Sequence, residues 1–159
     1  MNTKTVAMIA LCLAAALPVM AQSETEQTFE HGALGHGYRG FVEVGELSSE
    51  GILMPLSLST THGYQFNPHF FAGLGYTCGA VIGGTFSFLH ADVRYDLLSQ
   101  KAGSPFVSLR VATNGGQFGF RPSLGYRYKH LNLNAGYWGG AGDGYFWFTV
   151  GFDFGGRKH

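Results

Sequence analysis

The sequence is poor in charged residues, and this scarcity narrows its class. Asp, Glu, Lys and Arg make up 13% of the 159 residues, whereas soluble domains carry about 25%. Acidic and basic residues balance at ten each, so the chain lacks the basic face that a nucleic-acid partner requires. We therefore expect no nucleic-acid binding, and a surface unlike that of an ordinary soluble enzyme.

Long hydrophobic runs are missing except at the N-terminus. The run over residues 6–17 has 12 residues, too few for a membrane-spanning helix, which needs about 20. It follows Lys4 and precedes Val19, Met20 and Ala21, an order typical of a secretory signal peptide and its cleavage site. We predict cleavage after Ala21, and the short run disfavours the alternative of an uncleaved helical anchor.

Cysteine is also scarce, since the chain has only two. Removal of residues 1–21 would leave Cys78 as the one cysteine, so we expect no intramolecular disulfide in the mature protein. The remaining 138 residues suffice for one domain with its own core. No linker or charge run divides them. We expect a flexible periplasmic leader over 22–36, one domain over 37–154 and a short tail over 155–159.

Glycine and aromatic residues are abundant, with 25 Gly, 14 Phe and 8 Tyr. From Gly37 onward, segments of alternating polarity are separated by turn residues such as Asn67-Pro68. No helix signature of useful length interrupts them. The predicted strands are 37–46, 52–66, 69–78, 85–96, 105–114, 117–128, 130–139 and 144–154. Each is long enough to cross a membrane, which takes about 9–11 residues.

The alternation has a period of two, so each strand has one apolar and one polar face. The apolar face includes Leu74, Leu109 and Leu133 and carries no Asp, Glu, Lys or Arg. The polar face carries nine charged residues, which are Arg39, Glu43, Asp92, Arg94, Asp96, Arg110, Arg121, Arg127 and Asp153.

The face that points into the barrel distinguishes a soluble barrel from a membrane barrel. A soluble, lipocalin-like barrel turns its apolar face inward, but this polar face, rich in glycine and poor in lysine, would coat a soluble protein badly. Aromatics such as Tyr38, Tyr128 and Tyr137 gather at strand ends with aliphatics between them, as in membrane barrels. We predict an all-β, eight-stranded antiparallel up-and-down transmembrane β-barrel in the cell outer membrane, monomeric and surrounded by outer membrane lipids and lipopolysaccharide.

Three positions do not fit the simple pattern. Pro122 lies on the apolar face in mid-strand, where a bulge would accommodate it. Phe86 and Phe88 share the parity of the charged residues, so we expect a bulge near residues 88–89 that restores the alternation. His62 has apolar-face parity and is expected near a rim.

The segments HGYRGFVE, from His36, and STTHGYQFNPHFFAGLGYTCG resemble a family of small eight-stranded outer membrane β-barrel proteins, the OmpX-like and OmpA-transmembrane-like group. The resemblance covers residues 36–154. The terminal strand FWFTVGFDF resembles the aromatic-ended signal that barrel-assembly machinery recognises, which implies that machinery as a partner. It departs from the usual ending, because five residues follow Phe154.

The sequence leaves three functional interpretations: a plugged structural barrel, a lipid-modifying enzyme and a surface-binding barrel. We favour a salt-bridged plug over a catalytic or ion-conducting site, because an eight-stranded barrel is just wide enough to be filled by side chains.

No histidine pair has ligand spacing, so no metal and no cofactor are expected. A lipid-modifying enzyme would use His62, the one outward histidine of the strands, but no carboxylate shares its face. A surface-binding or adhesion barrel is the other alternative, and the expected external connections, near 47–51, 79–84, 115–116 and 140–143, are short for it.

Overall fold

Eight β-strands and no helix make up the described part of the chain. The structure, a computed structural model, describes residues 36–49, 52–81, 84–98, 103–140 and 144–155. The strands are β1 (Gly37–Ser49), β2 (Ile52–Gln65), β3 (Phe70–Val81), β4 (Gly84–Asp96), β5 (Gly103–Thr113), β6 (Phe118–Tyr128), β7 (Leu131–Gly140) and β8 (Tyr145–Gly155). All eight predicted strands are present, and no end differs from its prediction by more than three residues.

Three of the predicted segments lie wholly or mostly outside this range. The signal peptide over 1–21 falls wholly outside the described residues, as does nearly all of the leader and of the tail. Within the described ranges, no helix has the length and apolar character needed to span a membrane.

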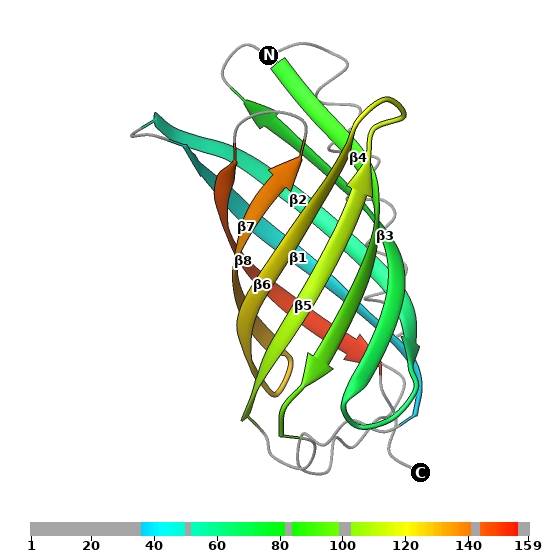
Figure 1. The fold of residues 1–159 in the computed structure, drawn as a ribbon. Coiled ribbons are helices and arrows are strands. Elements are labelled where there is room, and N and C mark those ends of the chain that lie inside the picture. Colours follow the sequence, from blue (N-terminus) through cyan, green and yellow to red (C-terminus); the bar gives the residue numbers. More distant parts are fainter. Residues whose placement is uncertain (1–35, 50–51, 82–83, 99–102, 141–143, 156–159) are drawn as a thin grey trace.

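The strands form one closed barrel in which each strand pairs antiparallel with the next and β8 pairs with β1 (Figure 1). The predicted eight-stranded, all-antiparallel, up-and-down fold is confirmed. A row of paired residues that leaves β1 at Gly37 returns to β1 at Leu47, ten residues further along. This stagger accounts for the steep tilt of the strands in Figure 1, because stagger and tilt are coupled in a closed sheet.

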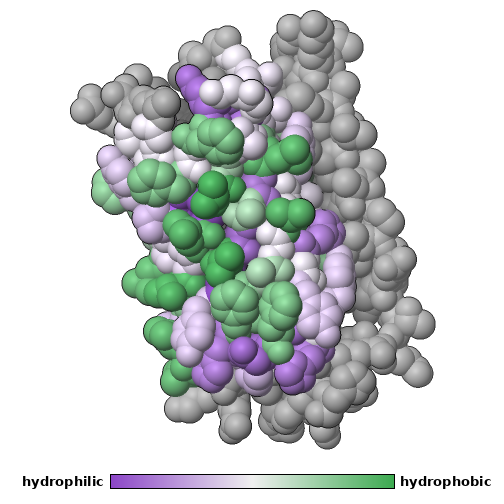
Figure 2. All heavy atoms as spheres, turned by 45° about the vertical axis from the view of Figure 1, so that its right-hand side comes forward, coloured by the Kyte–Doolittle hydropathy of each residue, from purple (hydrophilic) through white to green (hydrophobic). Residues whose placement is uncertain are grey.

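The polar face of every strand points into the barrel and the apolar face points out. Leu74 is 71% exposed and Phe118 is 73% exposed, whereas Glu43 and Arg94 are completely buried. Figure 2 shows apolar side chains spread over the side of the barrel and hydrophilic ones gathered at its lower end. The apolar face therefore points outward, opposite to the inward apolar face of a lipocalin-like barrel.

The expected bulge in the fourth strand does not exist. β3 and β4 pair without a register shift from Val81–Gly84 to Phe70–Tyr95. Phe86 and Phe88 instead keep the inward parity of Asp92 and stack on each other with ring centroids 5.8 Å apart. The inward side chains at this end of β4 are apolar, and in the sequence this pattern looks like a one-residue shift in the alternation.

Pro122 also sits in the barrel without a bulge. It pairs with Leu109 on β5, and the register between β6 and β7 is the same on both sides of it. The pairing with β7 is interrupted only at Arg121 and Pro122, as expected from a residue that has no N–H to donate. The described barrel has its register shift elsewhere, between Glu46 and Ser48 of β1.

Short connections join the strands at both ends. At the end opposite the start of β1, two residues separate β1 from β2, two separate β3 from β4, and four lie in each of the other two connections. The start of β1 and the end of β8 lie at the same, lower end of the barrel (Figure 1). We call that the lower end and the opposite one the upper end.

Candidate functional site in the barrel interior

The nine charged residues predicted to share one face all lie in the barrel interior. Each is at most 4% exposed. They come from β1, β4, β5, β6 and β8, because inward positions on a strand recur every second residue. The structure sorts them into a central group, a lower group and one separate arginine.

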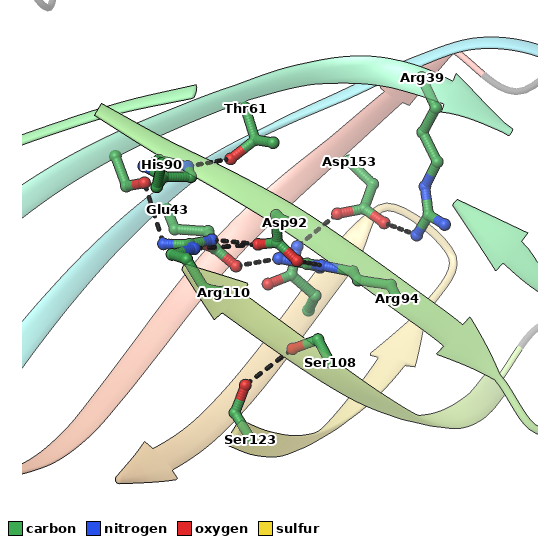
Figure 3. A network of polar contacts seen from close by, with 12 residues as sticks. Arg39, Glu43, Thr61, His90, Asp92, Arg94, Ser108, Arg110, Ser123 and Asp153 are labelled. Atoms are coloured by element: carbon green, nitrogen blue, oxygen red, sulfur yellow. Dashed lines mark hydrogen bonds and ion pairs between the residues drawn. The ribbon is translucent and has the colours of Figure 1, made fainter. Parts of the chain in front are cut away.

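The central group joins Glu43, Asp92, Arg94 and Arg110 (Figure 3). Asp92 and Arg110 are register partners on β4 and β5, and Arg110 Nη2 and Nε donate to Asp92 Oδ2 at 2.6 and 3.0 Å. Glu43 reaches them from β1, where Oε1 accepts from Arg94 Nη2 at 2.5 Å and Oε2 from Arg110 Nη2 at 2.6 Å. Two arginines and two carboxylates thus neutralise each other across the barrel.

The lower group is organised by Arg39 of β1. Its Nη2 lies 2.5 Å from Asp153 Oδ2, and its Nη1 lies 3.1 Å from Asp96 Oδ2. Arg127 Nε donates to the other oxygen of Asp96 at 3.2 Å, and Asn132 donates to Asp153. These pairs link β1, β4, β6, β7 and β8 near the lower end.

Three inward phenylalanines belong to the same interior and were missing from the predicted face. Phe41, Phe71 and Phe106 are at most 1% exposed. The guanidinium carbon of Arg94 lies 3.5 Å from the centre of the Phe41 ring and 4.9 Å from that of Phe106. Their parity was a usable signal, because Phe41 lies between Arg39 and Glu43 at the same two-residue spacing.

His90 is the inward histidine of β4, and hydroxyls hold both of its ring nitrogens. Nε2 lies 2.9 Å from Thr61 Oγ1, and Nδ1 lies 3.2 Å from Thr77 Oγ1. No group of three or more His, Cys, Asp or Glu residues within the described ranges is placed to hold a metal ion. His90 is thus a member of the polar interior with satisfied hydrogen bonds.

Arg121 differs from the other eight charged residues. Within the described ranges, no carboxylate lies within ion-pair distance of it. Its guanidinium carbon lies 5.2 Å from the centre of the Trp147 ring. Trp147 belongs to an aromatic cluster near the upper end, which also contains Phe86, Phe88 and Trp138.

On the outer face, the structure gives His62 two hydrogen-bond partners. The Tyr38 hydroxyl lies 2.5 Å from His62 Nδ1, and Thr60 Oγ1 lies 2.9 Å from Nε2. His62 lies three residues before the lower end of β2, opposite Gly40 of β1. A hydroxyl, an imidazole and a phenol in sequence resemble a nucleophile–base arrangement in outline, with a phenol where a triad has a carboxylate.

Apart from Arg121, the charged residues of the described interior compensate one another. Four of the five arginines contact carboxylates, and the acids contact arginines. Buried charges must be paired, because an isolated charge in a low-dielectric interior costs several kcal/mol. No family model, curated protein or solved structure matches the chain.

Proposed function

We propose that this chain is a structural or envelope-associated β-barrel protein of the Gram-negative outer membrane, with a lumen plugged by polar side chains and no catalytic activity. One observation carries the proposal: the barrel is apolar outside and charged inside. Water would penalise such an exterior, because contiguous exposed apolar surface on soluble proteins rarely exceeds a few hundred Å². Lipid accepts it.

The order of side chains along the outer face supports a membrane setting. Tyr38 pairs with Tyr64, and Phe70 pairs with Tyr95, near the lower end of the barrel. Tyr137 pairs with Phe146 toward the upper end. Aliphatic residues such as Leu109 and Leu133 lie between these levels. Two aromatic girdles around an aliphatic belt match the two interfaces and the core of a bilayer.

The ion pairs support a plug in preference to a pore. Open aqueous channels are formed by barrels of about 16 strands, whereas eight strands leave space only for side chains. Four of the buried arginines extend from four strands, β1, β4, β5 and β6, toward carboxylates on other strands. The pairs would then serve two purposes, holding distant strands together and obstructing the passage of solutes.

Export and assembly follow from the same proposal. We propose that the signal peptide over 1–21 directs secretion and is removed after Ala21, and that the OmpX-like and OmpA-transmembrane-like group is the family. The barrel-assembly machinery would recognise the aromatic end of β8, and the inserted protein would be a monomer among outer membrane lipids and lipopolysaccharide. The short connections disfavour adhesion, which commonly uses long loops.

Cell fractionation tests the proposal. The tagged protein should separate with the outer membrane on a density gradient and resist extraction by carbonate, which releases peripheral proteins. A variant with Ala21 and Val19 replaced by large residues should remain uncleaved and leave the outer membrane fraction. Recovery of the unaltered protein in the soluble periplasmic fraction would refute the membrane proposal.

Lipid modification is the second candidate, favoured by the hydrogen-bonded chain of Tyr38, His62 and Thr60 on the outer face. Mass spectra of lipid A and phospholipids from cells that overproduce the protein provide the test, with His62→Ala as the matched inactive variant. The structural proposal predicts identical spectra for the two strains. A lipid species that appears with the unaltered protein and disappears with His62→Ala would establish the enzyme instead.

A further inference from the structure

The interior charges of the described strands do not balance. Five arginines face four carboxylates, and each carboxylate is engaged by Arg39, Arg94, Arg110 or Arg127. Arg121 is 1% exposed and has no carboxylate within reach among the described residues. Its environment therefore lacks one unit of negative charge.

The neighbours of Arg121 make a negative charge beside it still more favourable. Its register partner across β5 and β6 is Arg110, another cation. Nε and Nη2 of Arg121 are buried and have no hydrogen-bond partner. The Trp147 ring at 5.2 Å offers a cation–π contact, and such a contact is worth about 2 kcal/mol when it is desolvated. That is less than the several kcal/mol that an unpaired buried charge costs.

Further buried polar atoms without partners lie on the adjacent strands. They are Trp147 Nε1, Thr149 Oγ1, and Nδ2 and Oδ1 of Asn134. Asn134 of β7 pairs with Thr149 of β8, and Gly136, the next inward residue of β7, pairs with Trp147. Together with Arg121 of β6, these groups line one wall of the interior, and an indole, a hydroxyl and an amide can all donate hydrogen bonds.

One monovalent anion would supply the missing negative charge and would accept hydrogen bonds from the donors that lack a partner. Water could supply hydrogen bonds but not charge, and a divalent anion would replace an excess of one positive charge by an excess of one negative charge. We propose that the interior binds a single monovalent anion, a halide or a small carboxylate. Arg121 supplies the charge, and Trp147, Thr149 and Asn134 supply further donors.

The aromatic cluster above this wall sets the preference among anions. Phe88 lies 5.2 Å from Trp138 and 5.9 Å from Trp147 between ring centroids, and these residues lie between Arg121 and the upper end. An anion that passes them loses most of its water. Desolvation costs least for weakly hydrated anions, and guanidinium is itself a weakly hydrated cation. Bromide should bind more tightly than chloride, and fluoride should bind least.

The test uses the full mature chain refolded in detergent, carrying Trp138→Phe so that Trp147 is the only tryptophan. Bromide is titrated at constant ionic strength against fluoride, and Trp147 fluorescence is recorded. The expected result is quenching that saturates, with chloride competing more weakly than bromide binds. Quenching that rises linearly with bromide would mean collisions only and would overturn the proposal.

Arg121→Met is the decisive variant, and Arg121→Lys is its matched control. The methionine variant removes an unpaired charge, so it should fold, but its quenching should lose saturation and its urea midpoint should no longer rise with bromide. The lysine variant should retain a weaker saturable response. A saturable response that survives unchanged in Arg121→Met would place the anion elsewhere and refute the site.

Crystals grown in bromide give the location directly. An anomalous difference peak within hydrogen-bonding distance of the Arg121 guanidinium is expected. Its displacement by formate would identify a carboxylate site, whereas its persistence would identify a halide site, and both support a monovalent anion. A carboxylate side chain of the protein seated on Arg121 in place of the ion would contradict the proposal.

Discussion

Glu43 joins two arginines of the central group, so the loss of its charge should lower the stability of the barrel strongly. Glu43→Gln keeps the shape of the side chain but removes the negative charge that lies 2.5 Å from Arg94 and 2.6 Å from Arg110. Asp92 would then face two arginines alone. Removing one partner of a buried ion pair costs about 3–5 kcal/mol, and we expect a loss in this range.

Urea unfolding of protein refolded into lipid vesicles measures this loss. With a slope of about 1–3 kcal/mol/M, the midpoint should fall by roughly 1–5 M. Lys129→Gln serves as the control, because Lys129 is an exposed charge in the connection after β6, and its loss should change the free energy of unfolding by less than about 0.5 kcal/mol. Equal midpoints for Glu43→Gln and Lys129→Gln would refute the view that the interior ion pairs stabilise the barrel.

Four further predictions follow from the faces, the packing and the signal peptide. Leu109→Arg should cost about 2–4 kcal/mol in a bilayer, and Tyr128→Arg at the rim about 0–1 kcal/mol; equal costs in vesicle refolding would argue against a membrane belt. Gly125→Ala would bring a methyl group against the Phe106 ring and to 2.6 Å from the Leu133 carbonyl oxygen, so its unfolding free energy should fall by about 1–3 kcal/mol. Mass spectrometry of protein from membranes should find residue 22 as the first residue, and retention of Met1 would contradict the signal peptide. Planar bilayers with the unaltered protein should show no stable conductance, and steady single-channel currents would exclude the plug.

The sequence was sufficient to predict the barrel and its two faces, because strand alternation is a local property. Each charged residue that shared parity in the sequence lies in the interior of the closed barrel. Parity identifies which side chains point into the barrel, but it does not give their positions along the barrel axis. The sequence therefore predicted the members of the charge network but not its pairs.

The pairs depend on stagger, which is a property of the closed sheet. Glu43 meets Arg94 and Arg110, residues more than 50 positions away, only because closure of β1 on β8 sets the relative heights of the strands. The same limit explains the two wrong bulges. Phe86 and Phe88 looked misplaced because no local signal shows that the upper interior is aromatic.

Spin-label accessibility along β5 tests the central claim, that the outer face meets lipid and the inner face is closed to it. Single labels at successive positions from Phe106 to Ala112 would be measured against oxygen, which partitions into lipid, and against a polar nickel complex. Oxygen accessibility should peak at Val107, Leu109 and Val111 and fall at Ser108 and Arg110, with little nickel access at any of them. High nickel access at Val107, Leu109 and Val111 would mean that water covers the apolar face and that the protein is not a membrane barrel.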